Sequence, residues 1–347
     1  TAKGTNAFGT ILPAILEWKR MGNPLGKISV VGTNGINSED SKLKAIELFK
    51  LAGIELNIEF FPKSSNKNPE EYKSIIKNLK KPSCAIVVVP DHLHFKVTYD
   101  CLNAGLHVLL AKPLTPTFEE GKNLVSLAKK NNLYTAVEFH KRWDKANLML
   151  RDSFNSGRLG TPLYCNVEYS QRKSIPTKFF RSWSEKTTIL QYLGVHYLDI
   201  IRFITGSITK RVIATGQKKF LFSKGINTYD SIQCFVEWEL KTKDRFVQTI
   251  HTNWIDPETS SAMSDQKIKF VGTKGHFQSD QKDRGIKINV DNENLEHPNP
   301  YFCNIFTNEL GFKQWHGYGI ESIKIFLNDI CSIIKEKSSV NDFINKR

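Results

Sequence analysis

The sequence has few cysteines, and they lack the spacing typical of a disulfide-bonded or metal-binding protein. Six cysteines occur in 347 residues, and no two form a Cys-x-x-Cys motif. This scarcity argues against a disulfide framework and against a zinc or other metal site of the cysteine-pair kind. We therefore expect free thiols in the core. The cysteines stand at positions 84, 101, 165, 234, 303 and 331.

Long apolar runs are absent as well. The chain has no stretch of 18 apolar residues and no signal-peptide pattern, whereas a membrane-spanning helix needs about 20 such residues. We expect a cytoplasmic protein without a membrane partner. Its 40% hydrophobic and 24% charged residues are ordinary for a globular protein. The length of 347 residues suggests about two domains.

The positive charge is not gathered into one block. The formal net charge is +14, but the lysines are dispersed along expected helices. Aromatic residues do not interleave with them as in a nucleic-acid-binding module. A lysine-rich surface explains the charge, and nucleic-acid binding is the alternative that we do not favour. The same positive field suits a phosphorylated cofactor or a nucleotide-linked substrate.

Strand-like and helix-like segments alternate through the first 140 residues. Two Val/Leu-rich runs, 84–89 and 106–110, flank a helical stretch and are typical of a βαβ unit in a parallel sheet. The alternation predicts an α/β domain over 1–140. Further strands are expected over 27–31, 56–60 and 133–139, and helices over 8–19, 41–52, 69–79, 116–130 and 146–154. On the helix over 116–130, one side gathers Phe118, Leu124, Val125 and Leu127.

The pattern changes after this point. Successive strands with few helices predict a second, α+β domain over 141–347, with one largely antiparallel open sheet. Gly272–Gly275 is expected to form a turn that joins two strands, and 291–300 is a polar loop. The expected strands cover 163–170, 211–215, 231–239, 246–254, 268–271 and 276–280, and the expected helices cover 190–204 and 319–335.

Lys112 is the first candidate for chemistry, because it follows directly after the strand over 106–110. Ligands of open α/β sheets bind beyond the carboxyl ends of the strands. Pro90, His92 and His94 follow the preceding strand in the same way. We interpret His94 as a structural or cofactor-side group rather than as a base.

The chain begins with a turn that resembles a phosphate-binding loop before a helix. The fingerprint is Gly-x-Gly-x-x-Gly after a strand. Gly4 and Gly9 fit its outer positions, and Asn6 stands in the middle one. We expect Gly4, Thr5, Asn6, Ala7 and Phe8 to bind the cofactor, and the strand before them to lie almost wholly outside this chain. Ordinary turn glycines are the alternative.

The next strand ends without the acid that an NAD-preferring fold uses on the ribose hydroxyls. Thr33 and Asn34 stand there instead, and Lys42 and Lys44 follow on the next helix. These residues favour NADP over NAD.

Five features in this order resemble the glucose-fructose oxidoreductase / inositol dehydrogenase (Gfo/Idh/MocA) family. They are the 4–9 turn, Pro90–His94, Ala111-Lys112-Pro113, His140–Asp144 and Leu193–Asp199. The resemblance implies a Rossmann domain, a C-terminal domain whose open sheet forms a homodimer or homotetramer, and hydride transfer between NAD(P) and a sugar or cyclitol hydroxyl.

The resemblance also implies roles for single residues. Lys112 would reach both the nicotinamide ribose and the substrate hydroxyl, and His196 would be the acid/base on that hydroxyl. The chemistry agrees, because a carbinol that loses hydride must also lose a proton, and a nearby ammonium stabilises the alkoxide. Asp199, three residues beyond His196, would touch the same helical face.

Two positions depart from the family pattern. The glutamate expected before the lysine is Ala111, and the carboxylate expected four residues before the histidine is Tyr192. Tyr192 shares a helical face with His196 and could bind substrate, relay a proton or only fill space. The departures keep two alternatives open, an NAD-using enzyme of elimination, epimerisation or glycoside cleavage without net redox, and a non-catalytic sugar or nucleotide sensor.

Other candidates border the same motifs. We expect Arg142 on the cofactor side, and His140 and Trp143, with Tyr192 and His196, on the substrate side, although a buried packing role suits Trp143 equally well. Weaker substrate-side candidates are Lys178, Arg181, Trp183 and the segment Trp315-His316-Gly317-Tyr318. A strand of the second domain ends with further candidates, either for substrate contacts or for a subunit interface: His251, Asn253, Trp254 and Asp256.

Overall fold

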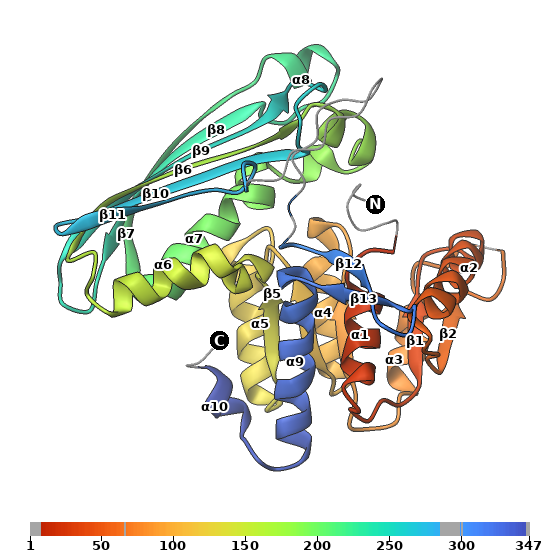
Figure 1. Cartoon of the computed structure of the whole chain (residues 1–347). Helices are drawn as coiled ribbons and strands as arrows, with labels where there is room; N and C mark the ends of the chain where they lie inside the picture. Colours follow the sequence, from red (N-terminus) through yellow and green to blue (C-terminus); the bar gives the residue numbers. More distant parts are fainter. Residues whose placement is uncertain (1–7, 66, 285–298, 300, 345–347) are drawn as a thin grey trace. The chain divides into compact units, whose positions relative to one another are not determined.

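The computed structural model describes residues 8–65, 67–284, 299 and 301–344. The chain divides into two compact units (Figure 1). Unit 1 contains 1–89, 93–140 and 301–347, and unit 2 contains 90–92 and 141–300. The predicted loop over 291–300 lies outside the described residues, apart from Asn299.

Unit 1 is built from parallel strands and helices. Strand β1 (Ile28–Val31) pairs with β2 (Ile58–Phe61), and β4 (His107–Ala111) lies between β3 (Cys84–Val87) and β5 (Thr135–Glu138), all in parallel. The helices are α1 (Ile11–Arg20), α2 (Gly35–Ala52), α3 (Glu71–Lys77), α4 (His94–Asn103), α5 (Phe118–Lys130), α9 (Tyr318–Ile334) and α10 (Val340–Ile344), and a hairpin is formed by β12 (Asn304–Thr307) and β13 (Lys313–His316).

Helices cover both faces of β4, which explains its uninterrupted apolar run. Val108 and Leu110 pack in one core cluster with residues of α4 and α5. Leu109, between them, packs in another cluster with residues of α1 and α9. Successive side chains of a strand point to opposite faces. The structure therefore confirms the predicted parallel, doubly covered sheet.

Helix α9 belongs to unit 1, which differs from the predicted domain boundary. Phe326 of α9 packs in the cluster that holds Trp18 of α1 and Leu109 of β4. The Tyr134 hydroxyl also donates to the Asp329 carboxylate at 2.8 Å. The C-terminal segment 301–347 therefore completes the first unit instead of the second.

The predicted apolar side of α5 was partly wrong. Leu124 is buried, but Phe118 is 80% exposed and Val125 is 44% exposed. The buried positions are Gly121, Leu124 and Ala128. A Cβ at Gly121 would lie only 3.1 Å from the Thr115 side chain and 3.2 Å from the Leu114 side chain, so this position packs closely as glycine. The hydrophobicity of the sequence alone favoured the larger side chains.

Unit 2 is a six-stranded sheet with helices packed against it (Figure 1). The strand order is β11-β10-β6-β9-β8-β7, and only the β6–β9 pair among these described strands is parallel. This confirms the largely antiparallel open sheet. Its elements are α6 (Lys145–Asn155), β6 (Pro162–Arg172), α7 (Val195–Thr205), β7 (Ile208–Gln217), α8 (Phe220–Ser223), β8 (Ser231–Glu239), β9 (Arg245–Asp256), β10 (Ser264–Gly272) and β11 (Gly275–Asp280).

All six cysteines are free thiols, as expected. Four of them are buried and two are half-buried. Burial raises the pKa of the Cys84 thiol to about 11 and that of Cys101 to about 12. These thiols are therefore protonated, and unreactive, near neutral pH.

Candidate active site

Lys112 follows the last residue of β4, as the sequence predicts. Because β3, β4 and β5 are parallel neighbours, their carboxyl ends lie at one edge of the sheet. The residue before Lys112, Ala111, is the register partner of Glu138 at the end of β5. Unit 1 therefore places a lysine and a carboxylate at adjoining strand ends.

His94 fixes the segments that follow β3 and β4. Its ring is fully buried, with Nδ1 2.6 Å from the Pro113 carbonyl oxygen and Nε2 3.0 Å from the Val89 carbonyl oxygen. Pro113 directly follows Lys112. The contacts of His94 are thus structural, and they position the backbone beside Lys112.

Glu138 and His140 form a hydrogen-bonded pair beyond β5. The Glu138 Oε2 atom lies 2.8 Å from His140 Nδ1, and each side chain is 19% exposed. The Ser322 hydroxyl of α9 donates to the other carboxylate oxygen. The His140 ring stacks on Tyr318, with centroids 5.8 Å apart and planes 15° apart, and it contacts Phe302. Sequence motifs pointed to His140 and Tyr318, whereas no motif pointed to Glu138 or Ser322.

The cofactor-side candidates of unit 1 are described only in part. Gly4, Thr5, Asn6 and Ala7 lie outside the described residues. Phe8 meets the edge of Trp315, with centroids 6.5 Å apart. No acidic residue stands in the first turn of α1.

Asn34 and Thr33 follow β1, where an acid is absent. The Asn34 side chain accepts the Asn37 backbone N–H at 2.8 Å and so caps α2. The Thr33 carbonyl accepts the Asn68 N–H at 2.8 Å. The Thr33 hydroxyl and the Asn34 side chain stand where a Rossmann fold binds the ribose.

Pro90 and His92 belong to unit 2 together with Asp91, so the Pro90–His94 motif is divided between the units. The Asp91 carboxylate is buried and accepts the Thr187 hydroxyl at 2.7 Å. Pro90 and His92 flank this anchored carboxylate and are half-buried.

His196 lies in the first turn of α7 and is buried. The predicted single helix over 190–204 consists of a π-helical turn, Leu190–Gly194, followed by α7. A Cβ at Gly194 would lie 2.5 Å from the end of the Leu190 side chain, which would have to shift to make room for it. Such π-helical turns often occur at functional sites. Tyr192 remains about one turn before His196.

Tyr192 is set among aromatic rings. Its ring centroid is 4.9 Å from Phe180, 6.1 Å from Trp183 and 5.9 Å from Trp254. Burial, and to a smaller extent the Asp91 carboxylate, raises the pKa of Tyr192. Its hydroxyl therefore keeps its proton near neutral pH and acts as a hydrogen-bond donor, not as a base.

Arg142 is held by the carboxylate of Asp199. Its Nε atom donates to Asp199 Oδ2 at 2.7 Å, and its terminal nitrogen donates to Oδ1. Burial raises the pKa of Asp199, and Arg142 opposes this shift. Trp143 packs edge-on against Phe203, at 6.0 Å. The guanidinium that was expected on the cofactor side thus has a structural partner in unit 2.

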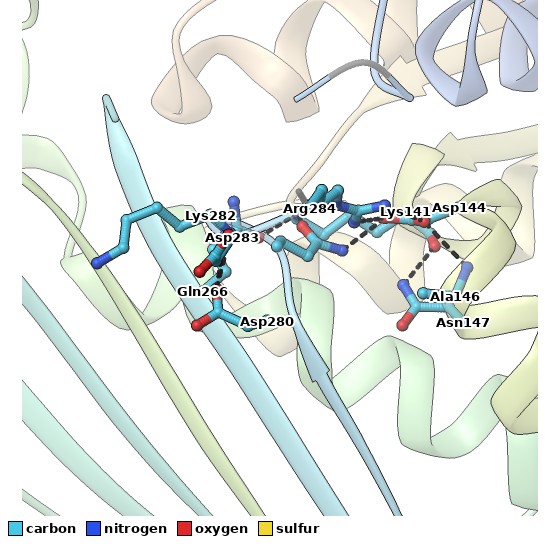
Figure 2. Close-up of polar contacts among 10 residues, drawn as sticks. Lys141, Asp144, Ala146, Asn147, Gln266, Asp280, Lys282, Asp283 and Arg284 are labelled. Atoms are coloured by element: carbon cyan, nitrogen blue, oxygen red, sulfur yellow. Dashed lines mark hydrogen bonds and ion pairs between the residues drawn. The ribbon is translucent and has the colours of Figure 1, made fainter. Parts of the chain in front are cut away.

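Lys141, which precedes Arg142, belongs to a buried polar network that no sequence pattern indicated (Figure 2). Lys141 donates to the side-chain oxygens of Gln266 and Gln281, the latter at 2.9 Å. Gln281 in turn donates to Asp144 at 2.6 Å, and Arg284 binds both Asp144 oxygens. Asp144 has no exposed surface. These groups connect the residues just before α6 with β10 and with the segment that follows β11.

The weaker candidates lie at mostly structural positions. Trp254 is fully buried and donates to Gln171 at 3.2 Å, and Asp256 accepts the Ser170 hydroxyl at 2.6 Å. Trp315 is buried, and its backbone N–H donates to Glu17 at 3.0 Å. Lys178, Arg181, Trp183, His251, Asn253 and His316 lie at half-buried or exposed positions.

Among the residues that the structure describes, no group of three or more His, Cys, Asp or Glu side chains is placed to hold a metal ion. No helix in this described part of the chain has the length and apolar character needed to cross a membrane.

Two models of one protein family match successive parts of the chain. Residues 27–139 match the oxidoreductase family with an NAD-binding Rossmann fold, and residues 148–278 match the GFO/IDH/MocA C-terminal domain. The two matches fall mainly on unit 1 and unit 2, respectively.

The chain is similar to parts of curated sugar and cyclitol enzymes. It is 30% identical over 133 residues to scyllo-inositol 2-dehydrogenase (NADP(+)) of Bacillus subtilis, over 37% of each protein. It is 26% identical over 206 residues to D-glucoside 3-dehydrogenase of Escherichia coli, over 56% of this chain and 57% of that enzyme. Each alignment thus spans less than two thirds of the relative.

Solved structures share the fold over nearly the whole chain. The myo-inositol 2-dehydrogenase of Lactobacillus plantarum matches with a TM-score of 0.61 at 15% identity, over 92% of this chain and 93% of that one. The scyllo-inositol dehydrogenase of Lactobacillus casei, solved with NAD(H) and scyllo-inositol, matches with a TM-score of 0.57 at 15% identity, over 91% and 92%.

Proposed function

The chain belongs to the Gfo/Idh/MocA oxidoreductase family, and from this premise we propose that it transfers a hydride between NAD(P) and a hydroxyl or ketone of a sugar, cyclitol or nucleotide sugar. The observation that carries the proposal is the carboxyl edge of the parallel sheet in unit 1. Lys112 follows β4 there, and Glu138 and His140 stand at the end of β5. An open α/β sheet binds its ligand at this edge.

The residues present fit a dinucleotide. The ten-residue helix α1 begins without an acid in its first turn, and such a helix N-terminus suits a pyrophosphate. We assign Gly4, Thr5, Asn6, Ala7 and Phe8 to the pyrophosphate side and Thr33 and Asn34 to the adenosine ribose. Because no acid follows β1, a 2′-phosphate meets no negative charge from this strand end, and the proposal favours NADP.

Lys112 and His196 have separate roles in the proposed reaction. The bound nicotinamide supplies a hydride acceptor for the carbinol carbon. Lys112 polarises the reacting oxygen and stabilises its developing negative charge. The imidazole of His196 takes the hydroxyl proton, since its ordinary pKa lies near neutral pH. Tyr192, whose phenol stays protonated, orients the substrate by a hydrogen bond.

The test is a cofactor and substrate screen on the purified chain. We expect reduced cofactor, measured by its absorbance, with one or more inositols, glycosides or nucleotide sugars. Lys112→Met and His196→Asn should each lower kcat/KM by about a hundredfold or more. Lys129→Met, on the exposed surface of α5, is the matched control and should leave it unchanged.

Other outcomes would contradict the proposal. Epimerisation, elimination or glycoside cleavage without net reduced cofactor would point to the non-redox alternative. Ligand binding without turnover, or full activity in Lys112→Met, would point to a sensor.

We also propose that the chain forms a homodimer or homotetramer through the sheet of unit 2. Nine of the ten residues of β7 are exposed, among them Ile208, Val212 and Ile213. An edge strand with exposed apolar residues on it favours association. The molar mass in solution, measured by light scattering, tests this, and a monomer at micromolar concentration would contradict it.

A further inference from the structure

We propose that Glu138 is a positioning residue, which holds the His140 imidazole with its proton on Nδ1 and so makes Nε2 the nitrogen that takes up and releases a proton at the carboxyl edge of the sheet. This inference rests on the proposed oxidoreductase function and adds a second proton-transfer group to it. Neither the family resemblance nor any motif of the sequence implies a role for Glu138.

The hydrogen bond between the two residues sets the tautomer. Glu138 Oε2 lies 2.8 Å from His140 Nδ1, and an ionised carboxylate accepts hydrogen bonds but donates none. Nδ1 must therefore carry a hydrogen. In the neutral ring, the lone pair then lies on Nε2. A carboxylate that orients a histidine in this way is a recurring device of acid/base sites.

The surroundings hold both side chains in place. The Ser322 hydroxyl donates to Glu138 Oε1, so both carboxylate oxygens accept a hydrogen bond within unit 1. The His140 ring lies nearly parallel to Tyr318 and contacts Phe302. Each of the paired side chains is 19% exposed. The imidazole is thus preorganised and still reachable by solvent.

The position of the pair connects it with the proposed reaction. Glu138 is level with Ala111 in the sheet, so the pair stands one strand from Lys112. Oxidation of an alcohol removes a hydride from carbon and a proton from oxygen. The hydride goes to the nicotinamide and the proton must reach solvent. His196 takes this proton from the hydroxyl in the proposed reaction, and we assign its onward transfer to solvent to His140 Nε2, from which water or buffer removes it. The Glu138 carboxylate stabilises the imidazolium while His140 holds the proton.

The first experiment reads the tautomer directly. Nitrogen-15 NMR of the ¹⁵N-histidine-labelled chain should show His140 with its hydrogen on Nδ1, the signal being assigned by its loss in His140→Asn. In Glu138→Gln, whose amide can also donate to Nδ1, the ring should move towards the other tautomer. Glu119→Gln, an exposed residue of α5, is the matched control and should change nothing. An Nε2–H tautomer in the unmodified chain would overturn the proposal.

The second experiment separates proton transfer from structure. With a substrate found in the screen, His140→Asn and Glu138→Gln should lower kcat by about ten- to a hundredfold with little change in KM. Added imidazole buffer should restore part of the activity of His140→Asn, which a packing defect would not allow. Glu138→Asp, which keeps the carboxylate, should retain more activity than Glu138→Gln. Loss of activity without buffer rescue would contradict the assigned role.

The two proposals fail in different ways. If no substrate yields reduced cofactor, the oxidoreductase function fails, whereas the NMR measurement still decides whether Glu138 sets the tautomer. If turnover occurs and His140→Asn retains full kcat at every pH, only the present inference fails.

Discussion

The two units use charged side chains in different ways. In unit 1, Glu138 and His140 stand at a strand end, each 19% exposed. In unit 2, Asp144 has no exposed surface, and Arg284 binds both of its oxygens. A buried charge must be fully paired, because an unpaired one is very costly away from water. The difference separates groups for which we propose a chemical role from groups that hold the fold together.

The largest expected effect comes from breaking the buried pair of unit 2. Asp144→Asn keeps the size of the side chain but leaves the Arg284 guanidinium without its carboxylate. We expect the free energy of unfolding to fall by about 3–5 kcal/mol. Urea denaturation followed by circular dichroism measures this change.

A matched variant on the same helix serves as the control. Asp152 in α6 has a side chain that is 76% exposed, and its nearest cation is 3.8 Å away. Asp152→Asn should change stability by no more than about 0.5 kcal/mol. Equal effects of the two substitutions would show that burial does not separate the two classes of charge.

Part of this arrangement could be predicted from the sequence. The strand over 231–239 matches β8, and Lys112 stands directly after its strand as expected. Both predictions follow from local patterns, because the periodicity of a strand and the end of an apolar run depend only on neighbouring residues. The hairpin of β10 and β11 was predicted for the same reason, from the Gly272–Gly275 turn.

The rest of the fold and of the candidate site depends on contacts between residues that are far apart in the sequence. Ser322, which holds Glu138, is 184 positions away from it in the chain, and Arg284 is 140 positions from Asp144. No periodicity can reveal such pairs. The return of α9 to unit 1 is of the same kind, because its apolar face fits either domain until the packing with Trp18 is known.

Arg142 was expected at the cofactor from the sequence, whereas the structure pairs it with Asp199. Its substitution shows whether it belongs with the charged groups that hold the fold together. Arg142→Met should lower the free energy of unfolding by about 2 kcal/mol, less than the loss expected for the fully buried Asp144 pair, because the Arg142 side chain is 18% exposed. Arg151→Met is the control, because both guanidinium groups lie 5.0 Å from the Phe203 ring.

The pH dependence of this effect has a definite sign. Burial already raises the pKa of Asp199, and Arg142 lowers it. Without Arg142 the folded state binds a proton at Asp199 more readily than the unfolded state does. The deficit of Arg142→Met should therefore shrink as the pH falls towards 5, and Asp199→Asn should remove most of it. A deficit that is independent of pH and of Asp199 would instead place the cost in lost packing.

The smallest expected effect concerns a histidine of unit 1 that lies at the start of a strand instead of its carboxyl end. His107 Nδ1 accepts the Tyr134 backbone N–H at 2.9 Å, so this nitrogen must be unprotonated. Burial, with a contribution from Lys81, lowers the pKa of His107 from its ordinary 6.5. The unfolded state therefore binds a proton first. The stability that His107 contributes is complete above pH 6.5 and is lost as the pH falls below that value.

His107→Asn separates this titration from the others, because the side-chain oxygen of asparagine can accept the same N–H and does not titrate. Thermal unfolding from pH 7.5 to pH 5 should fall less steeply in this variant than in the unmodified chain. His140→Asn is the comparison, because His140 Nδ1 faces the Glu138 carboxylate instead of a backbone N–H, and this variant should not flatten the slope. If both substitutions flattened it equally, the distinction between strand-end and structural histidines within unit 1 would fail.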